Sequence, residues 1–177
     1  MKAKWLWPLL AGLAGVAAYA GVALATPPSG VTNPPWAPVI GTFPKGINAS
    51  TKTDTGSGSG TGSWQIGITA TGWTDVYILE NVIVPGGTFG WHSHPGPSLV
   101  IVKSGTLSVY HGPSCTKEDY GPGSPNGSTF IDEGHDLHMV RNISATDIAD
   151  VYVVSFVPAG WSRRIDEANP NPAVCPN

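Results

Sequence analysis

Two histidines separated by one residue, His92 and His94, lie in a stretch of glycines and prolines that constrains the fold more than any other part of the chain. The stretch covers residues 86–98 and reads Gly-Gly-Thr-Phe-Gly-Trp-His-Ser-His-Pro-Gly-Pro-Ser. On a β-strand, residues two apart point to the same face, so both imidazoles can reach one metal ion. The surrounding glycines and prolines bend the backbone, which allows the rings to converge. The stretch therefore predicts strands arranged around a metal site.

A third histidine, His138, gives the chain two motifs that resemble those of the cupin family. The first cupin motif reads Gly, five residues, His-x-His, three or four residues, Glu, six residues, Gly. The matching residues here are Gly86, His92, His94 and Gly105. Ser98 stands where the family has Glu.

The second cupin motif reads Gly, five residues, Pro-x-Gly, two residues, His, three residues, Asn. Gly127, His138 and Asn142 keep this spacing. The inner Pro-x-Gly is replaced by Asp-Glu-Gly at residues 132–134, shifted by one position. Asn142 is expected to fix a turn through its side chain.

The resemblance covers about residues 64–157 and implies an all-β fold, the cupin double-stranded β-helix or jelly-roll barrel. It also implies that His92, His94 and His138 bind a divalent transition metal, with Fe, Mn, Zn, Ni and Cu all open. Without the motif Glu, three neutral nitrogens leave the ion its full charge, which favours an anionic ligand. Thiol dioxygenases, which are also cupins, use a three-histidine iron site of this kind.

The source of a carboxylate ligand is left open by the sequence. Ser98 is too short to replace Glu as a ligand, but its hydroxyl can hydrogen-bond a metal-bound water. The acidic residues that remain as alternatives are Glu80, Asp132 and Glu133. We expect His135 in a loop or behind the ligands, and His111 in contact with solvent.

Composition excludes some classes of partner. The chain has 177 residues, enough for one domain with a core, and only 12% are charged. Its 23 glycines and 17 prolines are typical of short strands and turns. The formal net charge is −3 and no basic patch is present, so nucleic acid is not an expected partner. We expect a small-molecule ligand or substrate, and the cupin resemblance leaves a homodimer open.

Residues 1–25 have the pattern of a secretory signal peptide, with two lysines before an apolar run and Ala-Leu-Ala at its end. An uncleaved membrane anchor is the alternative, because the apolar run is just long enough to span a bilayer. Cleavage would remove both lysines and change the formal net charge from −3 to −5. We expect a secreted, periplasmic or cell-envelope protein with no membrane contact after cleavage.

The rest of the chain divides into three segments by composition and residue pattern. Residues 26–63 are rich in Pro, Gly and Ser and predict a linker. Residues 64–157 predict the cupin barrel, and residues 158–177 predict a C-terminal tail that wraps it.

Within the predicted barrel, turn residues set the expected strand ends. An apolar strand is expected over residues 74–84, ending in a turn at residues 85–87. A tight hairpin turn is expected at residues 104–105. Residues 112–127, rich in Gly, Pro and Ser, predict a loop.

The two cysteines, Cys115 and Cys175, predict a disulfide in an exported protein. This disulfide would hold the C-terminal tail against the loop that follows His111. Trp91, beside the first ligand, should point away from the metal by strand alternation and pack against the barrel.

Three roles are compatible with these features. The first is a small metal-dependent oxygenase, isomerase or lyase acting on a small anionic molecule. The second is a barrel that binds a metal or small ligand outside the cytoplasm without turnover. The third is a structural role in which the metal or the disulfide acts as a staple.

Overall fold

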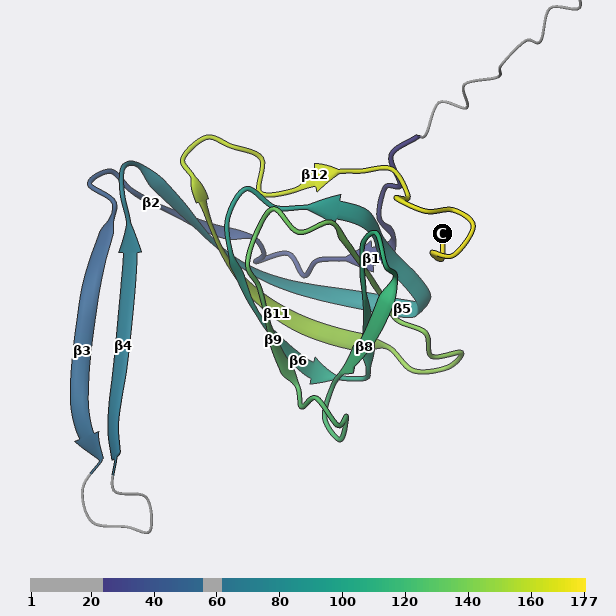
Figure 1. Cartoon of the computed structure of the whole chain (residues 1–177), viewed down its shortest axis with the longest axis horizontal. Coiled ribbons are helices and arrows are strands. Elements are labelled where there is room, and N and C mark those ends of the chain that lie inside the picture. The colour runs from purple at the N-terminus through teal and green to yellow at the C-terminus, as the bar shows by residue number, and fades with distance from the viewer. Residues whose placement is uncertain (1–23, 56–61) are drawn as a thin grey trace, which may run out of the picture.

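The computed structural model describes residues 24–55 and 62–177, which contain strands, turns and loops and no helix. The predicted all-β class is confirmed. Figure 1 labels most of the strands, β7 and β10 excepted. They are β1 (Ser29–Thr32), β2 (Val39–Phe43), β3 (Ile47–Thr55), β4 (Gly62–Ala70), β5 (Thr74–Ser93), β6 (Ser98–Ser104), β7 (Leu107–His111), β8 (Thr116–Tyr120), β9 (Thr129–Asp132), β10 (His138–Arg141), β11 (Ala149–Pro158) and β12 (Ile165–Asp166).

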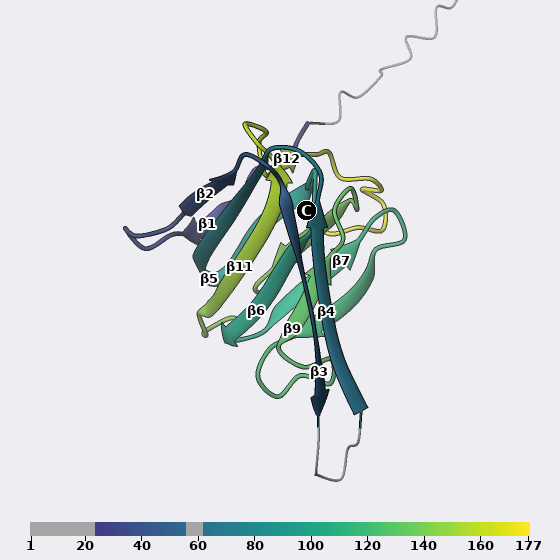
Figure 2. The same ribbon diagram turned by 90° about the vertical axis from the view of Figure 1, so that its left-hand side faces the viewer.

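Ten of these strands form one antiparallel sheet that curls into a nearly closed barrel (Figures 1 and 2). The strand order is β8-β7-β10-β5-β11-β6-β9, and β1, β2 and β12 add to β5. Apolar side chains from both walls meet inside it. The buried core consists of Ile83, Val100, Val102, Leu107, Val109, Val140, Ala149 and Val151.

Strand β5 belongs to both walls of the barrel. Its residues 74–83 pair with β11, and its residues 88–92 pair with β10. Between these parts Gly86 has a φ of 73°, a left-handed conformation that favours glycine. The turn predicted at residues 85–87 is therefore wrong as a strand end, because the strand bends there and continues. This bend brings the histidine-bearing end of β5 into the second wall.

The hairpin turn predicted at residues 104–105 is also wrong. Strand β6, before it, pairs with β9 and β11, whereas β7, after it, pairs with β8 and β10. The chain thus crosses between the walls at Gly105, which has a φ of 75°. A side chain at Gly105 would collide with the backbone of Ile148 and Ala149. Within residues 112–127, predicted as a loop, β8 forms because β7 offers it a paired edge.

The segment expected to be a linker, residues 26–63, contributes strands instead. Strands β1 and β2 pair with β5 and extend the barrel sheet. The prolines between them do not prevent this, because they lie outside the strands. Exposed apolar residues in β2, such as Val39 and Ile40, lie on this added edge.

Strands β3 and β4 pair only with each other and form a two-stranded hairpin, called here the hairpin arm. Figure 1 shows the arm standing beside the barrel. Strand β4 therefore does not join the barrel sheet, although its residues 64–70 lie in the segment predicted as barrel. Nearly all described side chains of the arm are exposed, on both faces.

Candidate metal centre

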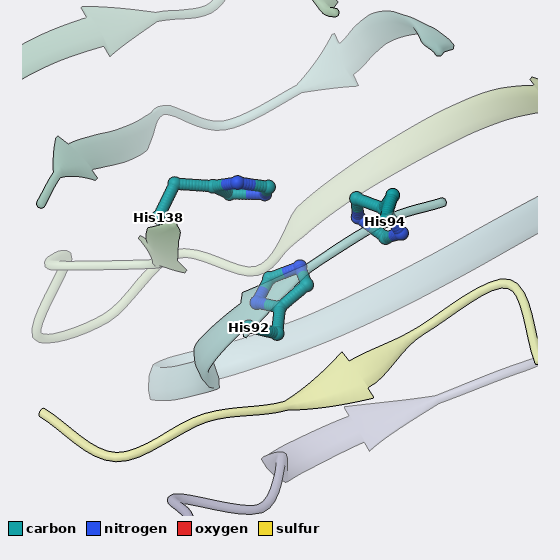
Figure 3. Close-up of side chains that lie close together, drawn as sticks. All are labelled: His92, His94 and His138. Atoms are coloured by element: carbon teal, nitrogen blue, oxygen red, sulfur yellow. The ribbon is translucent and has the colours of Figure 1, made fainter. Parts of the chain in front are cut away.

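The structure brings His92, His94 and His138 together at one end of the barrel. His92 lies near the end of β5, and His94 directly follows that strand. His138 begins β10, where it is the direct register partner of His92. All three residues are buried, with 3%, 7% and 5% of their surface exposed. Figure 3 shows the three rings pointing toward a shared space. One nitrogen from each ring lies within 4.8 Å of the others, a spacing from which they can hold one metal ion.

Backbone carbonyls fix the tautomer of each ring. The Nδ1 atom of His92 lies 2.8 Å from the carbonyl of Gly90, and that of His138 lies 3.0 Å from the carbonyl of Asp136. The Nδ1 atom of His94 lies 2.5 Å from the carbonyl of Arg163. A carbonyl can only accept, so each Nδ1 carries the proton and donates it. Each Nε2 is left with a free lone pair, the state that a metal ligand needs.

Burial keeps the three rings neutral. Loss of solvent lowers the pKa of His92 well below its usual value, and the neighbouring His138 lowers it further. Burial also lowers the pKa of His94, to about 4, and that of His138. At neutral pH the cluster therefore offers three unprotonated nitrogens without first having to release protons.

A carboxylate completes this cluster. The Oδ2 atom of Asp132 lies 3.3 Å from Nε2 of His94 and 3.5 Å from Nε2 of His138. Its side chain is 7% exposed, and Oδ2 is buried without a hydrogen-bond partner. Because both Nε2 atoms lack protons, the space between them is lined by electron pairs alone. A buried arrangement of this kind fits a cation, since a cation would satisfy all of these acceptors at once.

The other acidic alternatives lie elsewhere. Glu80 accepts a hydrogen bond from Lys103 at 3.1 Å, and Glu133 is exposed. Ser98 is fully buried, and its hydroxyl is hydrogen-bonded to that of Ser155 at 2.7 Å. The sequence offers Asp132 only as one of three candidates, because its place depends on a strand pairing that no local pattern reveals.

Two further histidines stay outside the cluster. His135 lies in a turn, where its backbone N–H donates to the carbonyl of His94 at 2.7 Å. The side chain of His111 is 42% exposed, and its Nε2 lies 3.7 Å from a carboxylate oxygen of Glu118. The expectations for both residues agree with these positions.

A layer of packed side chains supports the ligand strands from behind. Trp91 and Met139, the neighbours of His92 and His138, are register partners and are completely buried. They point away from the metal centre, as strand alternation predicts, and pack against Cys175. The indole N–H of Trp91 donates to the carbonyl of Pro176 at 3.0 Å.

The predicted disulfide between Cys115 and Cys175 is present, with a Cα–Cα distance of 5.3 Å. It holds the end of the tail over the buried layer formed by Trp91 and Met139. An earlier part of the tail forms β12, which pairs with β5 beside His92 and Ser93. Asn142 also acts as predicted, because its side chain bonds two backbone groups in the turn that follows β10. The same side chain donates to two backbone carbonyls of β5.

A small cavity of about 50 Å³ lies in front of the histidines. Its walls include two residues of the tail, Arg163 and Arg164. Arg164 donates to Asp166 at 2.6 Å and to the carbonyl of Phe89. Its Nη1 is buried without an acceptor in the described part of the chain. The tail therefore brings positive charge to the cavity.

The barrel, its bent ligand strand and the position of both motifs around one cavity decide the fold. The chain has the cupin fold. No protein-family model matches the sequence, and no curated protein matches it.

Solved structures with a similar barrel include cupins from bacteria. A cupin superfamily protein from Desulfitobacterium hafniense has 10% identity and a TM-score of 0.40, and the match covers 62% of this chain and 78% of that chain. A cupin-like protein from Thermotoga maritima has 18% identity and a TM-score of 0.42, over 53% of this chain and 65% of that chain. An oxalate oxidase has 23% identity and a TM-score of 0.37, over 48% of this chain. The match spans 46% of the oxalate oxidase chain.

The predicted leader lies almost wholly outside the described residues, which begin at residue 24. Among residues 24–55 and 62–177 there is no long, apolar helix of the kind that crosses a membrane.

Proposed function

We propose that this chain is an exported protein that binds a divalent transition metal through His92, His94 and His138 and acts with it on a small anionic molecule. The observation that supports this most is that one nitrogen from each of the three rings lies within 4.8 Å of the others, while a backbone carbonyl holds the Nδ1 of each ring. Histidines that are buried only for packing have no reason to share this arrangement. The disulfide supports an oxidising compartment.

Imidazole nitrogens suit several ions, so Fe, Mn, Zn, Ni and Cu are all candidates. Such an ion, when bound, would supply Lewis acidity or redox chemistry to an oxygenase, isomerase or lyase. The role of the protein is to orient the metal ligands and to exclude water from the site. The buried layer behind β5 and β10 supports this role, because it limits movement of the ligand strands.

The cavity limits the size and charge of the molecule. About 10–15 Å³ of such space admits one water, so a cavity of about 50 Å³ admits a ligand of only a few non-hydrogen atoms. Arg163 and Arg164 line this space, and the free Nη1 of Arg164 lacks an acceptor. A small carboxylate would bond this guanidinium and be attracted by the metal at the same time.

A non-catalytic barrel that retains a metal or small ligand is the second candidate. It is favoured by the closeness of the tail to the ligands, since the carbonyl of Arg163 itself holds His94. Residues 163–166 would have to shift for a larger substrate to enter. If residues 163–166 do not shift, the barrel would keep its metal or small ligand and would not turn over a larger substrate.

The first test is metal content, measured by elemental mass spectrometry on the purified protein and on a His92→Ala/His138→Ala double variant. We expect about one transition-metal ion per chain in the protein and none in the variant. Absence of metal from both, even after incubation with each of the five ions, would remove the proposal. Oxygen uptake and consumption of small carboxylates and thiols then separate the two candidates, because only the enzyme gives turnover that depends on His92.

A further inference from the structure

We infer that Asp132 is the carboxylate ligand of this metal site, taking the role that the first cupin motif gives to Glu at the position of Ser98. The inference rests on the proposed metal binding and adds a fourth ligand to it. Its basis is the free Oδ2 atom of Asp132, which is buried between the Nε2 atoms of His94 and His138.

The strand register explains how the carboxylate changes place. Strand β9 pairs with β6, and in this ladder Asp132 is the direct partner of Ser98. Paired residues on neighbouring strands point to the same face, with Cβ atoms about 5 Å apart. A carboxylate on β9 can therefore reach the space that a longer side chain on β6 would otherwise occupy. Ser98 leaves that space free, because its hydroxyl is bonded to Ser155.

The carboxylate is also held in position. Its Oδ1 atom accepts a hydrogen bond from the backbone N–H of Gly134 at 2.9 Å, which leaves Oδ2 to face the histidines. Gly134 has a φ of 84°, and a side chain there would collide with the backbone of Gly96. This turn is therefore restricted to glycine, and it fixes the orientation of Asp132 from behind.

Nε2 of His94, Nε2 of His138 and Oδ2 of Asp132 have no proton with which to form a hydrogen bond to one another. Both histidines use their Nδ1 protons on carbonyl groups, and an ionised Asp132 has none. A carboxylate oxygen buried against two lone pairs is unfavourable without a cation. With a divalent ion, these three atoms and a ring nitrogen of His92 would form a set of three nitrogens and one oxygen with a net charge of one. Compared with three nitrogens alone, such a set favours the harder ions, Mn²⁺ and Fe²⁺.

The test uses Co²⁺ as the probe, because its visible absorption reports the number and type of ligands. Affinity is measured by calorimetric titration of the full chain and of Asp132→Asn, which keeps the size of the side chain and the bond from Gly134. Glu133→Gln is the matched control, since it removes an exposed carboxylate at the adjacent position. His92→Ala marks the loss of the histidine site.

We expect Asp132→Asn to weaken Co²⁺ binding at least about tenfold and to change the absorption spectrum, as loss of a ligand does. Glu133→Gln should bind like the parent protein. We also expect metal-free Asp132→Asn to melt at a higher temperature than the metal-free parent, because the new amide can donate to a free Nε2. A residue that is important only for folding would lower that melting temperature.

The outcomes separate this inference from the proposed function. If the parent binds Co²⁺ in a manner that depends on His92, and Asp132→Asn binds it equally well with the same spectrum, the inference is wrong and the histidine site stands. If the parent binds neither Co²⁺ nor any of the five candidate ions, both are wrong. If Asp132→Asn loses Co²⁺ affinity and Glu133→Gln does not, the result supports Asp132 as the fourth ligand.

Discussion

The barrel end that carries the histidines and the hairpin arm are both antiparallel β-structure, but they differ in what covers their strands. At the metal centre, one face of β5 lines the cavity and the other lies under Met139 and the tethered tail. In the arm, nine residue pairs connect β3 and β4, and nearly all described side chains are exposed. Backbone pairing is therefore similar in the two regions, while burial is opposite. Since an isolated two-stranded hairpin is marginal in water, burial decides which region is stable and can hold a site.

The largest effect should come from Trp91→Ala. The indole is completely buried between Met139 and Cys175, so its removal leaves a cavity behind the ligand strand. We expect the free energy of unfolding to fall by about 4 kcal/mol, measured by urea denaturation. Trp64→Ala in the arm is the matched control, because Trp64 is 51% exposed, and it should change stability by less than about 0.5 kcal/mol. Similar losses in both variants would remove the contrast between the regions.

Removal of the disulfide should be next in size. The Cys115→Ser/Cys175→Ser double variant frees the tail from the segment before β8 and opens a disulfide between residues 60 apart in sequence. We expect the free energy of unfolding to fall by about 3 kcal/mol, within the usual range for native disulfides. Reduction of the parent protein should give a similar loss, and the double variant should not respond to reductant. An unchanged melting temperature would show that the tail adds nothing to the barrel.

Acid should destabilise the metal-free barrel through its histidines. Burial lowers the pKa of His94 to about 4 in the folded state, below the usual value of 6.5. The unfolded chain therefore binds protons that the folded chain does not bind. The stabilising contribution is complete above about pH 6.5 and is lost as the pH falls toward 4. We expect His94 alone to lower the free energy of unfolding by about 2 kcal/mol between pH 7 and pH 5, measured by denaturation without metal.

The histidines of the centre provide the control for this acid effect. His94→Gln should show a smaller loss between pH 7 and pH 5 than the parent, because one titrating group is gone. The described residues of the arm contain no histidine, so arm variants should keep the full acid response. A pH response that is unchanged by His94→Gln would contradict the assignment to the buried rings.

Local patterns made the metal centre predictable to the extent that its geometry is local. The alternation of a strand places His92 and His94 on one face, and motif spacing adds His138. Trp91 follows from the same alternation. Asp132 does not, because its place is set by the register between β9 and β6, which is a long-range pairing. The same is true of Arg164, since only the return of the tail brings it to the cavity.

The arm could not be predicted for a different reason. Residues 47–55 are polar, and the Gly/Ser tract beside them has the composition of a flexible linker. No alternation of apolar residues marks β3, because the arm has no buried face for such residues to fill. Likewise, Pro85 and the glycines after it read as a turn, although β11 and β10 take up pairing on either side and hold β5 together.

The smallest effect should come from removing the arm. Phe43 and Thr74 are direct partners in the β2–β5 ladder, so an Asn-Gly turn in place of residues 44–73 can connect them without moving either strand. We expect the free energy of unfolding to change by less than about 1 kcal/mol, because the removed strands bury little surface.

Metal content should stay the same in this variant, since every proposed ligand is retained. A loss close to that of Trp91→Ala would show that the arm and the barrel unfold as one unit. The groove between Ile66, Ile68, Leu99 and Ile131 would then be the region to examine, because these residues from the arm and the barrel line it together. An unchanged barrel would instead show that the cupin fold and its metal centre are complete without the arm.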